Sequence, residues 1–275
     1  MIILRSYRVR AHGLDRAYPE LEVGQMTASL PPTGGQSHGR RNLLIVVAGL
    51  FVLAAIAAGG YGLWYILIGP AEPAAVGAPV IPAGASVPAP ASLDGSWQVN
   101  GSLGNMADAS SSWVGYRVQE QLVGVGGHTA VGRTPKVSGS MTLTGSTVDN
   151  VQITADLTAL ASDDSHRDAQ LRRQAIETDT YPTATFKTTQ PVDLGSLPAE
   201  GKSVTVNATG ALTLHGVTRT VQIALQVQRQ GGIIAVAGSV PIVFADYGFQ
   251  GPSAFSVVSV DDHGTMELHL LFTHA

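Results

Sequence analysis

The sequence predicts an all-β domain preceded by a single transmembrane helix. From residue 95 to the C-terminus, apolar and polar residues alternate in short runs separated by turn residues. This pattern is typical of antiparallel strands with one buried and one exposed face. Before that domain, residues 43–68 contain no charged side chain, and about 20 apolar residues suffice to span a bilayer.

The composition excludes several classes of function. The chain contains no cysteine, so disulfides, thiolate metal ligands, a thiol nucleophile and a lipid-modified cysteine are excluded. Residues 1–42 carry six basic and three acidic side chains, whereas the whole chain has a net charge of −4. The remainder is therefore acidic and repels phosphate backbones, so we expect no nucleic-acid partner.

Residues 1–42 are interpreted as a disordered cytoplasmic tail, because they are polar and show no sustained apolar period. Translation starting at Met26 instead of Met1 would remove most of this tail. The two starts remain open alternatives.

Residues 43–68 are the predicted transmembrane helix. This run is longer than the 7–15 residues of a usual signal-peptide core, although cleavage is left open. Arg40 and Arg41 precede the run, and no basic residue follows it before Arg117. This asymmetry predicts a single-pass protein of the cell membrane, with the N-terminus in the cytoplasm and the C-terminal domain outside.

Residues 69–94 are rich in alanine and proline, a composition that favours an extended chain of about 3.1 Å per residue. We expect this linker to act as a stalk between the membrane and the domain at residues 95–275.

The domain is expected to contain about ten strands and one short helical insertion at residues 165–176, where Ser and Asp side chains offer N-cap oxygens. Many antiparallel strands either pack as two sheets or close into a barrel. We expect an apolar interior and a polar exterior. The strands are predicted at residues 97–100, 113–121, 137–143, 147–157, 183–189, 204–214, 218–229, 233–243, 255–260 and 265–272.

Four motifs in residues 95–273 resemble the YceI-like polyisoprenoid-binding family. Residues 114–118 (VGYRV) are similar to its first long strand, and residues 167–172 (RDAQLR) to its R-D-x-x-L-R helix. Residues 181–186 (YPTATF) match a Y-P-x-x-x-F strand entry, and residues 210–218 (GALTLHGVT) a G-x-L-T-x-H-G-V-T hairpin. The same order over most of the domain makes the resemblance specific.

The resemblance implies a lipocalin-like antiparallel β-barrel with a long apolar tunnel. The implied function is non-enzymatic binding, sequestration or transport of a long apolar lipid, polyisoprenoid or quinone-like. The alternative is a cell-envelope interaction or stress-response module whose barrel is filled by its own side chains. The candidate tunnel-lining or mouth residues are Tyr116, Val118, Met141, Ile153, Leu157, Arg167, Leu171, Tyr181, Phe186, Leu212 and Leu214. The rings of Tyr116, Tyr181 and Phe186 are interpreted either as core aromatics or as tunnel lining.

The sequence departs from the family where members often carry aromatic residues, at Ala175–Ile176 and at Arg133 after Gly132. The charged residues of the helical insertion, including Arg167, are interpreted either as an ion-pair clamp or as a polar mouth for a lipid head group. The histidines lack metal-ligand spacing and no nucleophile motif is present. We therefore expect no catalytic residue, no metal and no cofactor other than a bound lipid, and the sequence indicates no particular protein partner.

Overall fold

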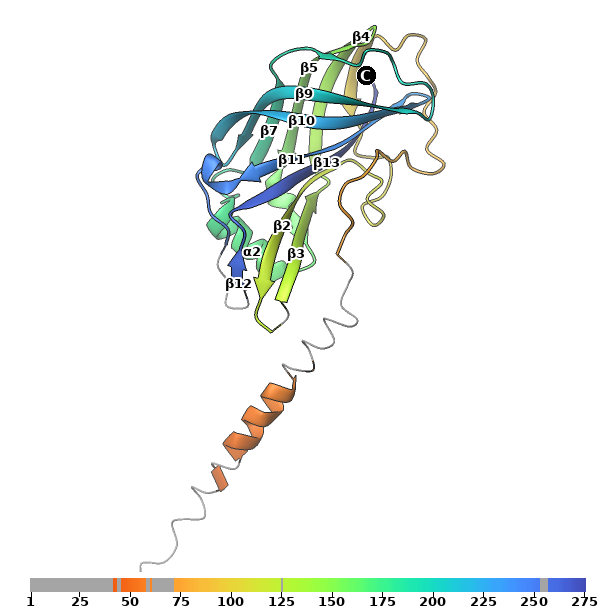
Figure 1. The fold of residues 1–275 in the computed structure, drawn as a ribbon. Helices are drawn as coiled ribbons and strands as arrows, with labels where there is room; N and C mark the ends of the chain where they lie inside the picture. The colour runs from red at the N-terminus through yellow and green to blue at the C-terminus, as the bar shows by residue number, and fades with distance from the viewer. Residues whose placement is uncertain (1–41, 44–45, 58–59, 61–71, 125, 253–256) are drawn as a thin grey trace, which may run out of the picture. The chain divides into compact units, whose positions relative to one another are not determined.

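The computed structural model describes residues 42–43, 46–57, 60, 72–124, 126–252 and 257–275 (Figure 1). The chain divides into two units, residues 1–56 and 57–275. Residues 42–43, 46–57 and 60 are helical. Within the described residues, no helix combines the length and the apolar character needed to cross a membrane. Nearly all of the predicted tail and about half of the predicted span lie outside the described residues.

Eight of the described strands form a closed antiparallel ring, because the first and last members, β1 and β13, pair with each other. The predicted antiparallel barrel with a short helix is therefore confirmed, and each predicted strand overlaps an observed one. The ring runs in the order β1 (Gly95–Val99), β4 (Val137–Thr144), β5 (Thr147–Asp156), β7 (Thr183–Thr188), β9 (Ser203–Leu214), β10 (Val217–Gln230), β11 (Ile233–Val243) and β13 (His263–His274).

A branch of shorter pairings extends the ring at one end. β2 (Trp113–Leu122) pairs with the first half of β13, and β3 (Gly126–Thr134) pairs with β2. We call this the helix end of the barrel, because α2, β12 and the β2–β3 hairpin gather there (Figure 1). The other end, which holds the β4–β5 and β10–β11 turns, is the far end. The branch also contains β6 (Ala161–Ser162) and β12 (Val257–Val260), and β8 (Val192–Asp193) pairs with β5.

The helical insertion lies where the sequence predicts it. α2 (Ser165–Gln170) continues into the π-helical turn η2 (Leu171–Ala175). The Asp164 carboxylate accepts hydrogen bonds from the backbone N–H groups of His166 and Arg167, which satisfies two free donors of the first turn. Two further turns, η1 (Leu157–Ala159) and η3 (Phe244–Tyr247), complete the helical elements among the described residues from 72 onward.

Residues 72–87 form a segment, here called the strap, that lies along the outer wall of the barrel. The strap starts near the helix end, where Glu72 accepts a hydrogen bond from the Thr129 N–H at 2.7 Å. It finishes at the far end, where the Gly232 N–H donates to the Val87 carbonyl at 2.8 Å. The expectation of a free extended stalk is therefore wrong for these residues.

The strap packs because the barrel wall offers it buried partners. The Val76 N–H donates to Glu267 Oε1, and the Val80 N–H donates to His269 Nε2, each at 3.0 Å. Further along, Ile81, Ala85 and Val87 pack on a small apolar cluster of Ile233, Ala235 and Leu271. Outward-facing side chains of β11 and β13 are consequently buried beneath the strap.

β3 is a strand that the sequence analysis did not predict. Its residues 128–132 are all buried, so the polar and apolar positions do not alternate as they do in a strand with one wet face. One face of β3 borders the barrel interior, and Thr129 on the other meets the strap through Glu72. Because the strap covers the outer face of β3, both faces of this strand are buried, and its sequence lacks the polar–apolar alternation that ordinarily predicts a strand.

Candidate functional site

Two apolar cavities occupy the interior of the barrel. The far cavity contains about 1110 Å³ of atom-free space, its open mouth included, and about 100 Å³ of it admits the centre of a water-sized sphere. The helix-end cavity contains about 900 Å³, of which about 110 Å³ is equally wide. Most of each cavity is therefore narrow, which suits a thin chain better than a bulky ring system.

The two cavities meet at a waist. Val114, Ala184 and Met266 line both of them. Ala184 is the smallest of these side chains and belongs to β7, while the other two come from the paired strands β2 and β13. We call the interior space made up of these two adjacent apolar cavities the bore, and the layer of three shared side chains its waist.

Ten of the eleven residues predicted as ligand-binding line this bore. The exception, Tyr181, packs instead against His215, with ring centroids 4.2 Å apart. Whether the ten contact a ligand stays a prediction. Met141, Ile153, Phe186 and Leu212 line the far cavity, and Tyr116, Val118, Leu157, Arg167, Leu171 and Leu214 line the helix-end cavity.

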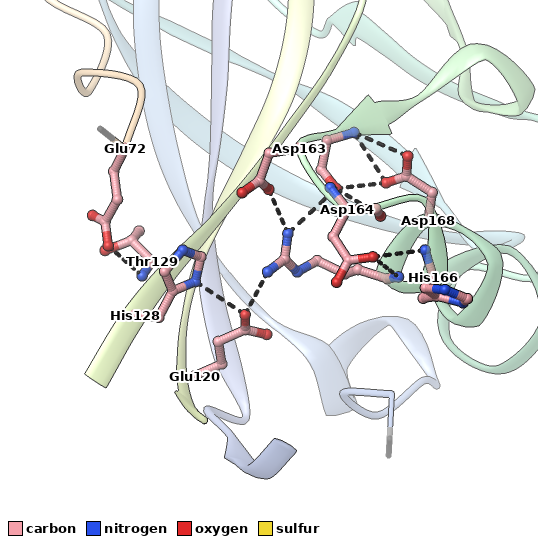
Figure 2. Close-up of polar contacts among 10 residues, drawn as sticks. Glu72, Glu120, His128, Thr129, Asp163, Asp164, His166 and Asp168 are labelled. Carbon is pink, nitrogen blue, oxygen red and sulfur yellow. Dashed lines mark hydrogen bonds and ion pairs between the residues drawn. The ribbon is translucent and has the colours of Figure 1, made fainter. Parts of the chain in front are cut away.

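A polar cluster closes one side of the helix-end cavity. Arg167 Nη2 donates to Glu120 Oε1 at 2.7 Å, and Arg167 Nη1 donates to Asp163 Oδ1 at 2.6 Å. His128 Nδ1 lies 3.0 Å from the same Glu120 oxygen. Figure 2 shows that the side chains of Glu120, His128 and Asp163 lie close together, although they come from β2, β3 and the loop before α2.

Glu120 and His128 are buried, Arg167 is nearly so and Asp163 is exposed, and the cluster holds two carboxylates for one guanidinium. Glu120 is 5% exposed and the Arg167 side chain 11%. Burial by itself lowers the pKa of Arg167, but the hydrogen bonds and charges of Glu120 and Asp163 outweigh it and raise that pKa. Because two carboxylates already hold this guanidinium, the cluster carries no excess positive charge.

Asp168 fixes the helix to the barrel. Its carboxylate accepts hydrogen bonds from the backbone N–H and the hydroxyl of Ser162 on β6. Of the two interpretations of the charged insertion, the clamp is thus present. Arg167 also lines the cavity, so the two interpretations coexist in one side chain.

Tyr116 supplies a polar group on the cavity wall. Its ring lies over Gly132 of β3, where an added Cβ would be 2.4 Å from the ring. Burial raises the pKa of the Tyr116 phenol. The nearby Ser162 side chain lowers it slightly, yet the hydroxyl makes no hydrogen bond of ordinary geometry among the described residues. A buried hydroxyl without a partner is costly, so this one is available to a ligand.

Sequence analysis missed Glu120, Ala184 and Met266. Glu120 had a detectable signal, because it follows Val114, Tyr116 and Val118 at alternate positions and places a charge on an otherwise apolar face. Ala184 had none, because small residues are common in strands of any kind. Among the described residues, no group of three or more His, Asp or Glu side chains is arranged to hold a metal ion.

The comparisons with known proteins agree with this geometry. A family model described as the YceI-like domain matches residues 106–272. The chain belongs to the YceI-like family. A UPF0312 protein of Vibrio cholerae is 33% identical over 121 residues, which cover 42% of this chain and 60% of that protein. A UPF0312 protein of Vibrio parahaemolyticus is 32% identical over 128 residues, covering 44% and 60%. The chain thus spans 60% of the length of these relatives.

A solved structure shares the YceI-like fold. It is that of a polyisoprenoid binding domain from Saccharophagus degradans implicated in plant cell wall breakdown. The two chains superpose with a TM-score of 0.52 and 22% identity, covering 65% of this chain and 98% of the other. At this level of identity the likeness concerns the fold alone. Ala175 and Ile176, where family members often carry aromatics, line the helix-end cavity of this YceI-like domain.

Proposed function

We propose that the YceI-like domain binds a long apolar lipid, polyisoprenoid or quinone-like, in its bore and carries or sequesters it without catalysis. The observation that carries the proposal is the pair of apolar cavities that lie next to each other inside the barrel and share one layer of side chains. Burial of one CH₂ group contributes about 0.8 kcal/mol. A lipid that extends through the waist therefore gains affinity from its chain alone, without any reactive group.

The polar cluster favours an uncharged head group. A phosphate or diphosphate head needs unpaired cationic donors, but Arg167 is already held by Glu120 and Asp163. The Tyr116 hydroxyl offers a single donor that suits a carbonyl or hydroxyl oxygen. We therefore propose a neutral lipid with one such oxygen at the helix end.

We also propose that residues 43–68 hold the domain outside the cytoplasmic membrane. Support comes from the uncharged run and from the arginines that precede it. Such a location would place the bore near the membrane in which long apolar lipids reside.

The alternative, a barrel filled by its own side chains, predicts a closed interior. The open bore weighs against it, because native cores leave few voids larger than a water molecule.

Organic extraction of the purified full-length chain, followed by mass spectrometry, tests the proposal. We expect a stoichiometric prenyl lipid, and reloading of the delipidated protein with a prenylquinone but not with a prenyl diphosphate. An empty protein that also fails to load any prenyl lipid would refute it. Two substitutions to phenylalanine serve as a matched pair, Ala184→Phe inside the waist and Ala211→Phe on the outer face of β9, which does not line the bore.

A further inference from the structure

We propose that the helix end of the barrel is a surface that docks on the lipid bilayer, which turns the helix-end cavity toward the membrane. This proposal rests on the membrane location proposed above. It adds the orientation of the barrel and the surface that meets the lipid.

The direction of the strap is the first observation. Glu72 is held at Thr129, the fourth residue of β3, which begins directly after the β2–β3 turn. Next, the Pro73 carbonyl accepts a hydrogen bond from Arg117, and the Ala74 carbonyl accepts one from Arg133. The later contacts, of Val76 with Glu267, Val80 with His269 and Val87 with Gly232, lie progressively farther toward the far end. The N-terminal part of the chain therefore joins the barrel wall at the helix end.

The short covalent connection between the predicted span and the strap restricts how far the helix end can lie from the membrane. Ile68 is the last residue of the predicted span, and Glu72 follows four positions later. Four peptide units extend to at most about 14 Å. With residues 43–68 embedded in a bilayer, the helix end cannot move farther than this from the end of the span while the strap remains in place. A free stalk of 26 residues would impose no such orientation.

The distribution of exposed apolar side chains is the second, independent observation. Among the described residues from 72 onward, four large apolar side chains are exposed. Three of them lie at the helix end: Val123 beside the β2–β3 hairpin, Val243 at the end of β11, and Val258 on β12. The fourth, Val80, lies on the strap. The concentration of three of these four side chains at one rim fits contact with an apolar interface.

Charge points to the class of lipid. Among the described residues, the exposed carboxylates at the same end outnumber the exposed arginines, Arg173 and Arg219; they are Glu177, Asp179, Asp246, Asp261, Asp262 and Asp163, which is paired with Arg167. An acidic rim repels anionic lipids, so apolar contact and the covalent tether, rather than electrostatic attraction, would hold the barrel on the bilayer. We therefore expect docking on zwitterionic phosphatidylcholine that is nearly independent of salt.

The test uses full-length protein reconstituted in phosphatidylcholine vesicles that contain a nitroxide-labelled lipid. Because the chain has no cysteine, a single substitution gives a unique site for a fluorophore. Val258→Cys places the label at the helix end, and Ser203→Cys places it at the exposed start of β9, at the far end. We expect the lipid nitroxide to quench most of the fluorescence at position 258 and little at position 203. Equal quenching, or the reverse order, overturns the proposal.

Matched insertions test the role of the strap. A flexible Gly/Ser segment of about 20 residues, with a root-mean-square span of about 25 Å, is placed either between residues 71 and 72 or between residues 91 and 92. The first insertion lengthens the tether before the strap and should abolish most of the quenching at position 258. The second leaves the strap and its entry point intact and should preserve the quenching. Quenching that survives the first insertion would contradict the role given to the strap.

Lipid extraction of the same samples separates the two proposals. Loss of orientation with a prenyl lipid still bound overturns only the docking surface. Failure to bind any prenyl lipid overturns the proposed function, whatever the quenching shows.

Discussion

Replacement of Ala184 by phenylalanine is expected to divide the bore and to weaken the binding of long lipids without unfolding the barrel. Ala184 is 6% exposed and lines both cavities. A ring at this position would fill the waist. Overpacking a core usually costs about 1–3 kcal/mol. Because the ring enters existing void, part of this cost is offset by recovered packing at ~24 cal/mol per Å³ of cavity filled, so the free energy of unfolding should change little.

The loss of affinity should be much larger. A lipid confined to one cavity leaves the rest of its chain in water, at about 0.8 kcal/mol per CH₂ group or ~4 kcal/mol per five-carbon isoprene unit. Even a quarter of that value, about 1 kcal/mol, weakens binding about fivefold.

The assay is a competition series in which prenylquinones of increasing chain length displace a fluorescent lipid. Wild-type affinity should rise with each added unit until the bore is full, whereas the affinity of Ala184→Phe should stop rising at a shorter chain. Ala211→Phe, on the outer wall, should follow the wild type. A folded Ala184→Phe protein with an unchanged chain-length dependence would refute the proposal that the lipid extends through the waist.

Three further predictions concern the polar groups. Tyr116→Phe should weaken the binding of a quinone about fivefold to tenfold, the equivalent of a hydrogen bond of about 1 kcal/mol. The binding of a prenyl hydrocarbon should not change. Tyr247→Phe, which removes a buried hydroxyl away from the bore, is the control in the same titration. Glu120→Gln should lower the free energy of unfolding by about 3 kcal/mol, because it leaves the buried Arg167 guanidinium short of a partner. The control, Glu200→Gln in the exposed pair with Arg229, should lower it by less than about 1 kcal/mol. Equal effects of the two substitutions in urea unfolding would contradict the account of the cluster. Burial lowers the pKa of His269 below 6.5, with the charge of Arg133 acting in the same direction. The unfolded chain therefore binds the proton more readily, and the strap contact, complete above about pH 6.5, is lost as the pH falls. Proteolysis within the strap should accelerate on acidification, and His269→Gln should flatten that dependence.

Much of the fold could be predicted because most strands have one apolar and one polar face. In β13, Met266, Leu268 and Leu270 point into the bore and line it, as the alternation predicts. The intervening Glu267 and His269 point outward, and sequence analysis placed them in water. They are 2% and 3% exposed instead, because the strap, 191 and 189 positions away in the sequence, covers them and donates one backbone N–H to each.

The strap itself could not be predicted for a related reason. An Ala/Pro-rich segment has no periodic apolar face, and its backbone N–H and C=O groups form its main contacts with the barrel. Those contacts depend on which side chains of β2, β3 and β13 happen to lie beneath it. Tyr181 was misplaced for a simpler reason, since the Y-P motif describes the entry to β7 and not the direction of the ring, which packs on His215.

The strap also sets where the independently folding part of this protein begins. The family match starts at residue 106 and the first barrel strand at Gly95, but a truncation at either point would strip the cover from Ile233 and Leu271, now 1% and 0% exposed. It would also leave the nearly buried Glu267 without its backbone donor from Val76. An expressed fragment should therefore start at or before residue 72, and shorter fragments should aggregate through the uncovered wall.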